Sequence, residues 1–247
     1  MPEPVPLRSW LSSLRPHGRL VGSLERVPPR LVLSDSDTAR DVLTFLGRAM
    51  RVSDDGIRLQ GRNGVLALTA SALAPKGLFD QTPTVLAMRI VHADPELECD
   101  IVVDELAQDQ DERMLTLPET GRSPAWAGVA PPRGGWEPAG RLDSATIARR
   151  AQWGISAVAR GATPGAGEEA VRALRAAIWG ESDEDLGGLV RGIAFAAHAF
   201  GFISGEEQIP VTTSGRWTRL AFRRGHVLAR GPMASGLTAV RSTGTQN

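Results

Sequence analysis

The sequence predicts an α+β fold: an N-terminal antiparallel sheet with one covering helix, then a three-helix region closed by a C-terminal three-stranded antiparallel meander. Alternating apolar and polar residues between glycine-bearing turns recur at residues 57–117 and again at 208–230, a pattern typical of half-buried strands. Between these stretches, residues 143–203 carry apolar residues spaced three and four apart, which indicates consecutive helices.

The composition indicates an ordinary globular protein. The chain of 247 residues has 28 basic and 28 acidic side chains and a hydrophobic share of 42%, which excludes a disordered chain. All basic residues except Lys76 are arginine, as high-GC bacterial coding favours, so arginine by itself indicates little about function. The only cysteine, Cys99, excludes an internal disulfide and is interpreted as a buried small hydrophobe. No membrane-spanning run or signal peptide is evident, so we expect a cytoplasmic protein.

Residues 1–119 are predicted as a β-rich region. Short apolar runs up to Leu33 are broken by Pro28-Pro29, which suits edge strands because proline cannot donate to a ladder. Four polar residues, 34–37, can cap a helix over residues 38–50. Five further strands are expected at Ile57–Gln60, Val65–Leu73, Thr84–His92, Leu97–Glu105 and Arg113–Leu117.

Residues 120–140 form a crossing segment with four prolines and five glycines. A connection of this length marks a domain boundary or a functional lid. Trp126 and Trp136 lie within it and either anchor the segment onto the folded parts or line a ligand groove; anchoring is favoured, because large aromatic side chains are usually buried.

Residues 141–231 are predicted as a helical region with the meander at its end. Asp143 or Ser144 can cap the first helix, which ends near Gly161. A second helix runs through residues 171–179, and a third, apolar on all sides, covers residues 186–203 after a capping box of Ser182 and Asp185. Residues 232–247 are small and polar and are predicted as a disordered tail.

The meander is the sharpest functional feature. Its strands are expected at residues 208–213, 216–223 and 226–230, with Thr213 opposite Arg216 and Arg223 opposite His226. Alternation then places one apolar face against the third helix. The opposite face is basic and carries one large aromatic side chain; it contains Thr212, Trp217, Arg219, Arg223, His226, Leu228 and Arg230.

Charge is segregated along the chain. Residues 94–119 contain ten acidic side chains and one arginine, whereas six arginines and no acidic residue follow Glu207. The two charged regions can pair within the molecule or between subunits, or both can be solvated. Alternatively, the basic face binds phosphates or stacks a base.

Signatures of catalysis are weak. The glycine-rich stretch 161–167 lacks the spacing and the lysine of a phosphate-binding loop, and no nucleophile elbow occurs. His198, on the apolar helix, is interpreted as a core histidine; as a general base it would need a carboxylate from the acidic strand. On that strand Glu98, Asp100 and Asp104 share one face, which is typical of a solvated surface.

We therefore predict a non-enzymatic, cytoplasmic protein-interaction module with a protein partner or a homodimer, no membrane association, no cofactor, no metal site and no catalytic residue. One alternative is the binding of nucleic acid or a phosphorylated ligand by the basic face; a second is an enzyme with a site between the two halves, near His198. The predicted binding residues are Trp217, Arg219, Arg223, His226, Arg230, Trp126 and Trp136.

Overall fold

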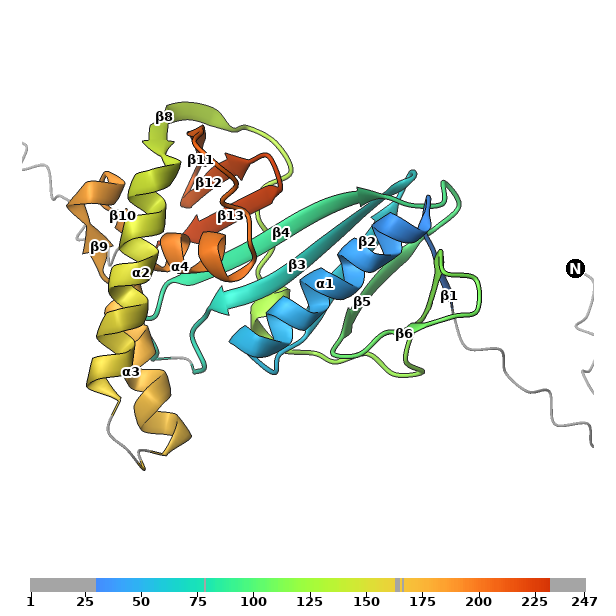
Figure 1. Cartoon of the computed structure of the whole chain (residues 1–247), viewed down its shortest axis with the longest axis horizontal. Coiled ribbons are helices and arrows are strands. Elements are labelled where there is room, and N and C mark those ends of the chain that lie inside the picture. Colours follow the sequence, from blue (N-terminus) through green and yellow to red (C-terminus); the bar gives the residue numbers. More distant parts are fainter. Residues whose placement is uncertain (1–29, 78, 163–164, 166, 232–247) are drawn as a thin grey trace, which may run out of the picture.

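The computed structural model of the chain describes residues 30–77, 79–162, 165 and 167–231. Within them the protein is a mixed α/β chain with one large antiparallel sheet and four α-helices (Figure 1). The predicted tail at residues 232–247 and the predicted edge strands before Arg30 lie outside the described residues.

The main sheet has eight antiparallel strands in the order β5-β2-β3-β4-β13-β12-β11-β8. The strands are β2 (Ile57–Arg62), β3 (Val65–Leu73), β4 (Thr84–His92), β5 (Cys99–Val103), β8 (Glu137–Asp143), β11 (Gln208–Ser214), β12 (Trp217–Phe222) and β13 (Gly225–Arg230). The edge strand β8 was not predicted, since its sequence contains proline and glycine, which are depleted in strands.

The two halves of the chain share this sheet at the pair β4 and β13. Ala87 lies opposite Val227 and Leu86 opposite Leu228. The predicted N-terminal sheet and the predicted meander are therefore parts of one sheet. Their pairing satisfies the backbone N–H and C=O groups that two open sheet edges would otherwise expose.

Two small sheets complete the strands. β7 (Met114–Thr116) lies between β1 (Arg30–Val32) and β6 (Ala107–Gln108). The strand predicted at residues 113–117 therefore belongs to a separate small sheet, in which Leu31 faces Leu115 and both are fully buried. β9 (Ser182–Asp183) pairs with β10 (Leu189–Val190).

Helix α1 (Ser36–Val52) covers the N-terminal half of the sheet (Figure 1). Its N-cap is Asp35, whose carboxylate accepts a 2.7 Å hydrogen bond from the Thr38 amide, as the polar run predicts. Val42, Phe45 and Leu46 are buried, as predicted, whereas Met50 at the end of the stripe is 36% exposed.

The C-terminal half supplies α2 (Ser144–Gly161), α3 (Glu168–Gly180) and α4 (Gly192–Ala199), together with short 3-10 helices η1 (Ala125–Gly128) and η2 (Glu184–Leu186). Asp143 caps α2, as predicted, accepting from the Thr146 amide at 3.0 Å. Figure 1 shows α1, α2 and α4 on the same side of the main sheet.

The prediction of a long apolar helix at residues 186–203 is wrong. Gly187 and Gly188 have φ angles of 66° and 81°, a left-handed conformation that ends the η2 turn and that glycine adopts without strain. Only α4 remains helical, and His198 within it is exposed rather than part of the core. The predicted capping box is absent too, since Asp183 caps η2 by accepting from the Asp185 amide at 3.1 Å.

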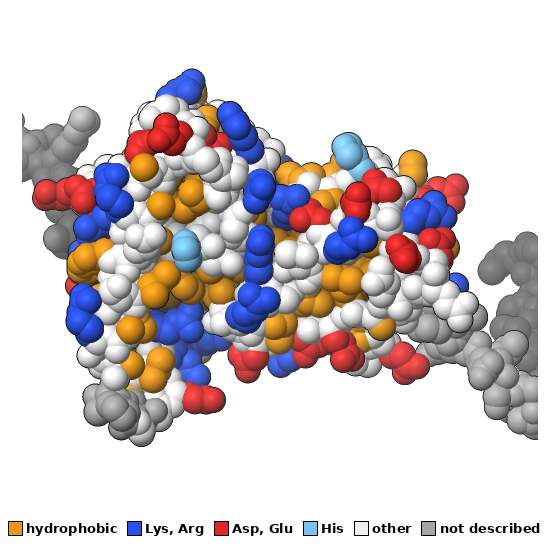
Figure 2. All heavy atoms as spheres, viewed as in Figure 1, with side chains coloured by type: hydrophobic (Ala, Val, Ile, Leu, Met, Phe, Trp, Pro, Cys, Tyr) orange, Lys and Arg blue, Asp and Glu red, His pale blue; other side chains and the backbone are white. Residues whose placement is uncertain are grey.

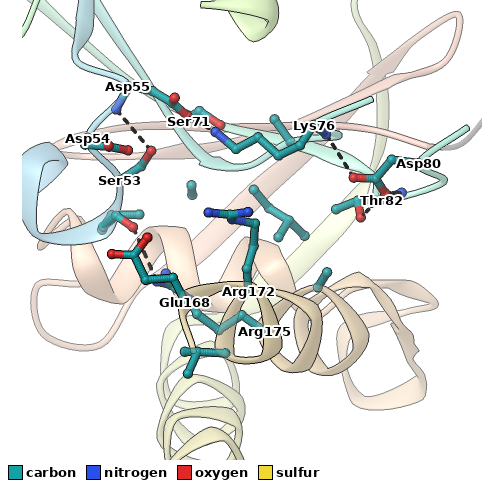
Figure 3. Close-up of a pocket in the computed structure, with 16 residues that line it drawn as sticks. Ser53, Asp54, Asp55, Ser71, Lys76, Asp80, Thr82, Glu168, Arg172 and Arg175 are labelled. Atoms are coloured by element: carbon teal, nitrogen blue, oxygen red, sulfur yellow. Dashed lines mark hydrogen bonds and ion pairs between the residues drawn. The ribbon is translucent and has the colours of Figure 1, made fainter. Parts of the chain in front are cut away.

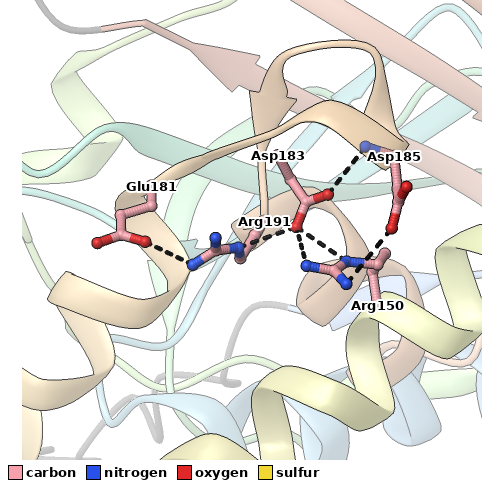
Figure 4. Close-up of polar contacts among 5 residues, drawn as sticks. All are labelled: Arg150, Glu181, Asp183, Asp185 and Arg191. Atoms are coloured by element: carbon pink, nitrogen blue, oxygen red, sulfur yellow. Dashed lines mark hydrogen bonds and ion pairs between the residues drawn. The ribbon is translucent and has the colours of Figure 1, made fainter.

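A buried ion-pair network ties α2 to the segment before α4 (Figure 4). The Asp183 side chain is 3% exposed and accepts from Arg150 Nε at 2.8 Å and Arg191 Nε at 2.9 Å. Burial raises the pKa of Asp183, but the bonds from Arg191 and Arg150 outweigh it and hold the pKa below its usual value. Both guanidinium groups also lie over the Trp153 ring, at 4.8 and 4.6 Å.

The main core lies between the helices and one face of the sheet. Leu66 and Leu68 of β3 pack there with α1, and Leu220 and Val227 pack with Ile193 of α4. Cys99 at the edge of this core is half-buried rather than enclosed, and burial raises the pKa of its thiol. Among the described residues no α-helix covers the other face of the sheet, and Trp217, Arg219, His226 and Arg230 of the predicted binding residues lie on it.

Candidate functional site

The meander positions the basic face as the alternation predicts, although both hairpin registers differ from the prediction. Thr213 lies opposite Thr218, and Ala221 lies opposite His226. Each hairpin is thus shifted by two residues from the predicted pairing. Because side chains alternate with a period of two, a shift of two residues leaves every strand side chain on its predicted face.

The predicted apolar face packs on α4. Ile209, Val211 and Leu220 belong to the main core. The opposite face, which we call the helix-free face, carries Trp217 and Leu228, and these are 6% and 2% exposed. Side chains from the crossing segment cover them.

An aromatic cluster forms where the crossing segment lies on the helix-free face. Trp126, on η1, is 4% exposed, and Trp136 is half-buried beside it. Two sets of predicted binding residues that lie far apart in the sequence therefore pack side by side. The cluster consists of Trp126, Trp136 and Trp217 with Leu86, Val102 and Leu228.

Arg219 is held against the aromatic cluster. Its guanidinium carbon lies 4.6 Å from the centre of the Trp136 ring, a cation–π geometry. Its Nε donates to Thr212 Oγ1 at 3.3 Å, and Trp136 Nε1 donates to Pro132 O at 3.2 Å. These contacts fix the orientation of both side chains.

His226, on β13, lies near Arg219 of the neighbouring strand β12. It is half-buried, and its Nδ1 atom is buried without a hydrogen-bond partner among the described residues. Burial, and then the charge of Arg219, lower the pKa of His226 below 6.5. The imidazole therefore contributes less positive charge to the face than an ordinary histidine would.

The two remaining predicted residues differ in position. Arg230 is half-buried on the helix-free face and makes no ion pair within the described residues. Arg223 is not on a strand: it lies in the turn between β12 and β13, its side chain is 77% exposed, and its Nε is 3.7 Å from Glu207 Oε2.

Beyond the aromatic cluster, the helix-free face continues as a strip that no described segment covers. Ile90 is 51% exposed and Val65 is 39% exposed. Ala67 faces Ile90 across β3 and β4, and Met88 faces His226 across β4 and β13. We call Val65, Ala67, Met88, Ile90 and Ala221 the uncovered strip. The alternation of residues in β3 and β4 predicts which side chains share this face. The sequence alone does not indicate that no described segment packs on them.

Positive charge borders the uncovered strip. On strands β2, β3, β4, β13 and β12, all of which are fully described, this face carries arginines and no carboxylate. Arg58 bonds Asp100 of β5 at 2.7 Å. Arg62, Arg219 and Arg230 make no ion pair in the part of the chain that the structure describes.

In the part of the chain that the structure describes, the acidic region pairs partly with nearby arginines and not with those of the meander. Asp100 pairs with Arg58, Asp104 with Arg122, and Asp109 with Arg30. The Arg58 hydrogen bond lowers the pKa of Asp100. Figure 2 shows acidic side chains more often at the end that carries β1, β5 and β6. Segregation of charge along the sequence is thus also segregation in space.

The structure does not assemble the predicted enzyme site. His198 is on α4, which covers one face of the sheet, whereas Asp100 is on the opposite face with Arg58. In the described ranges, no group of three His, Cys, Asp or Glu residues is placed to hold a metal ion. The described helices also include none with the length and apolar character required to span a membrane.

Comparisons with known proteins give no function. Residues 27–128 match a family described as Domain of unknown function (DUF8010), and residues 131–234 match Domain of unknown function (DUF8185). No curated protein shows significant similarity to this chain.

Some solved structures are similar over much of the chain. A DNA polymerase sliding clamp from Caulobacter crescentus is 12% identical with a TM-score of 0.44, covering 88% of this chain and 69% of that one. A sliding clamp from Bartonella birtlesii is 12% identical with a TM-score of 0.45, covering 84% and 66%. At these identities and TM-scores, no activity or partner transfers to this protein.

Proposed function

We propose that this chain is a cytoplasmic protein-interaction module that docks a partner on the uncovered strip. The partner presents an apolar side chain to Ile90 and carboxylates to the surrounding arginines. The observation that carries the proposal is the 51% exposure of Ile90 on a sheet face that bears arginines and no carboxylate across five strands. Apolar side chains ringed by arginine are typical of protein interfaces.

The geometry favours an acidic protein over a nucleic acid. Proteins that bind single strands commonly stack bases on exposed aromatic rings, but Trp126 and Trp217 are at most 6% exposed and Arg219 lies over Trp136. Nucleic acid or a phosphorylated ligand remains the second candidate, supported by the arginines Arg62 and Arg230, which have no carboxylate partner among the described residues.

The structure also offers a way for the partner to be a second copy. The chain has an acidic region around β5 to β7 and a basic helix-free face, and complementary charge favours such pairing. We retain the homodimer as a form of the same proposal, since the uncovered strip is the docking surface in both cases.

The predicted division into a β-rich region (1–119), a crossing segment (120–140) and a helical region with the meander (141–231) remains a proposal. The two matched families meet between residues 128 and 131, inside the crossing segment. The two regions nevertheless share one sheet, so we expect them to unfold together.

A variant pair tests the docking surface. Ile90→Ser removes the apolar contact from the strip, whereas Ile155→Ser changes an isoleucine of similar exposure, 39%, on α2. In affinity capture from cell extract, the proposal expects a protein retained by wild type and Ile155→Ser and lost from Ile90→Ser and Arg219→Glu. Analytical ultracentrifugation of the same variants identifies a homodimer. Retention of every captured protein by Ile90→Ser would refute the docking surface.

A DNA-binding experiment distinguishes the nucleic-acid function from the protein interface. Single-stranded DNA titrated at low and high salt would bind wild type and lose affinity steeply with salt if the basic face holds a polyanion. Binding of DNA that Arg219→Glu abolishes and Ile90→Ser leaves intact favours the nucleic-acid function over the protein interface.

A further inference from the structure

A cavity lies between α3 and the end of β3, and none of the residues of the uncovered strip lines it (Figure 3). Its volume is about 530 Å³, within the usual range for small-molecule sites. Figure 3 shows Glu168, Arg172 and Arg175 on α3, facing Asp55, Lys76 and Asp80 on the opposite wall. Aliphatic side chains, among them Leu73 and Val171, form much of the remaining lining.

Most charged groups on the wall opposite α3 are already engaged. Lys76 Nζ bonds Asp55 at 2.6 Å. The Asp80 carboxylate accepts from the Lys76 and Thr82 amides, both at 2.9 Å, and from Thr82 Oγ1 at 2.5 Å. The Thr82 hydroxyl bond is the main cause of the lowered pKa of Asp80. These groups bond one another and nearby backbone amides, and they leave little capacity for a ligand.

Arg175 differs from these groups because it lacks a counter-ion. It is half-buried, its one hydrogen bond is a 3.4 Å contact to Val52 O, and no carboxylate lies within 4.0 Å among the described residues. Its guanidinium carbon lies 5.3 Å from the Phe195 ring centre, a cation–π contact that holds the group in place. Arg172, by contrast, pairs with Glu169, which is outside the cavity.

An unpaired and partly buried guanidinium favours an oxyanion. Burial lowers the pKa of Arg175, which reflects the cost of holding a charge away from water without a partner. The planar fork of a guanidinium can bond both oxygens of a carboxylate or two oxygens of a phosphate. A ligand with such a group would relieve that cost.

The rim carries the opposite charge. Asp54 and Glu168 are exposed at the cavity and make no ion pair within the described ranges. Glu168 lies seven residues before Arg175, so both project from the same face of α3. A ligand with anionic groups alone would be repelled by these two carboxylates, whereas a ligand that also carries an ammonium group would match both ends.

We propose that this cavity binds a small zwitterion, whose carboxylate or phosphate is received by Arg175 and whose ammonium group faces Glu168 and Asp54. The aliphatic lining accommodates the carbon chain between the two charges. This site is separate from the uncovered strip and does not depend on the interaction function.

Isothermal titration of the full chain with four probes tests the ligand class. 6-Aminohexanoate and phosphoethanolamine are the carboxylate and phosphate zwitterions; hexanoate and inorganic phosphate are their counterparts without an ammonium group. We expect one zwitterion to bind more tightly than its counterpart, and which one binds identifies the oxyanion. Absence of binding by both zwitterions at millimolar concentration would overturn the proposal.

Variants assign the two ends of the ligand. Arg175→Met keeps an unbranched side chain against Phe195 and should weaken zwitterion binding by about tenfold or more, as expected for loss of a charge-assisted bond. Arg149→Met, on the exposed part of α2, is the matched control and should bind like wild type. If the methionine variant fails to fold, Arg175→Lys is used instead. It retains the charge and should bind with intermediate affinity.

Glu168→Gln addresses the ammonium group. It should reduce the preference for the zwitterion over its anionic counterpart without abolishing anion binding. An unchanged preference in Glu168→Gln would contradict the zwitterion assignment, and unchanged affinity in Arg175→Met would contradict the role of Arg175. Ile90→Ser should leave all four titrations unaltered, so failure of the docking surface and failure of this site are distinguishable.

Discussion

The Arg219 guanidinium lies over the Trp136 ring at 4.6 Å, which joins the meander to a residue of the crossing segment more than 80 positions earlier in the chain. This contact closes one side of the aromatic cluster and orients an arginine beside the uncovered strip. It therefore links the stability of the crossing segment to the proposed docking surface.

Replacing Arg219 by Met should lower the free energy of unfolding by about 0.5–1 kcal/mol, the value of a partly exposed cation–π contact. Chemical denaturation monitored by tryptophan fluorescence measures the change. Arg160→Met, an exposed arginine near the end of α2, is the control and should have little effect. Equal stabilities of the two variants would show that the stacking contributes nothing.

Replacing Asp183 by Asn should destabilise the protein by about 3 kcal/mol, because two arginines would lose the charge that they surround in a buried network. Thermal unfolding followed by circular dichroism measures it. The surface pair of Asp111 with Arg113 at 3.0 Å provides the control, since Asp111→Asn should leave the unfolding temperature almost unchanged. A wild-type unfolding temperature in Asp183→Asn would contradict the structural role of the network.

Replacing Gly154 by Ala should cost about 1–3 kcal/mol through overpacking. A Cβ atom at this position would lie 2.2 Å from two ring atoms of Trp179, which is 2% exposed. Gly47→Ala is the matched helical control, because a Cβ atom added at Gly47 would have nothing within 4 Å. Alanine should there stabilise the helix by about 0.5–1 kcal/mol. Urea unfolding of the two variants should give changes of opposite sign.

His226 should make stability depend on pH. Its folded-state pKa is lowered below 6.5 by burial and by Arg219, so the unfolded chain binds a proton that the folded protein does not. Its contribution is complete above pH 6.5 and is lost as the pH falls below that value through the folded pKa. Urea unfolding at several pH values should show a shallower decline in His226→Gln than in wild type. Parallel curves would exclude this residue as a source of the slope.

Much of the fold follows from local signals in the sequence. The ranges of β3 and β4, the capped starts of α1 and α2, and the two faces of the meander all depend on alternation or on a cap within a few residues. The faces were predicted even though the registers were shifted, because an error of two residues conserves alternation. The exact turn residues around Gly215 and Arg223 set the hairpin registers, and the sequence did not determine them.

The rest depends on partners distant in sequence. The apolar sequence of β4 predicts a strand but not its neighbours, so nothing near β4 in the sequence predicts its pairing with β13. The same holds for the crossing segment, whose tryptophans indicate burial but not that they bury Trp217. The tertiary packing of other elements determines whether His198 and Ile90 are exposed and whether a cavity forms around Arg175. For that reason the binding residues were predicted as separate sets rather than as one cluster.

The pairing of β4 with β13 has a consequence for synthesis of the chain. A nascent polypeptide exposes the edge of β4 long before β13 leaves the ribosome, because more than 130 residues separate the two strands in the chain. Such an open edge is a template for pairing with other chains. The nascent chain is therefore prone to aggregation until β13 pairs with β4, and premature termination before β13 would leave the β4 edge of the truncated product open.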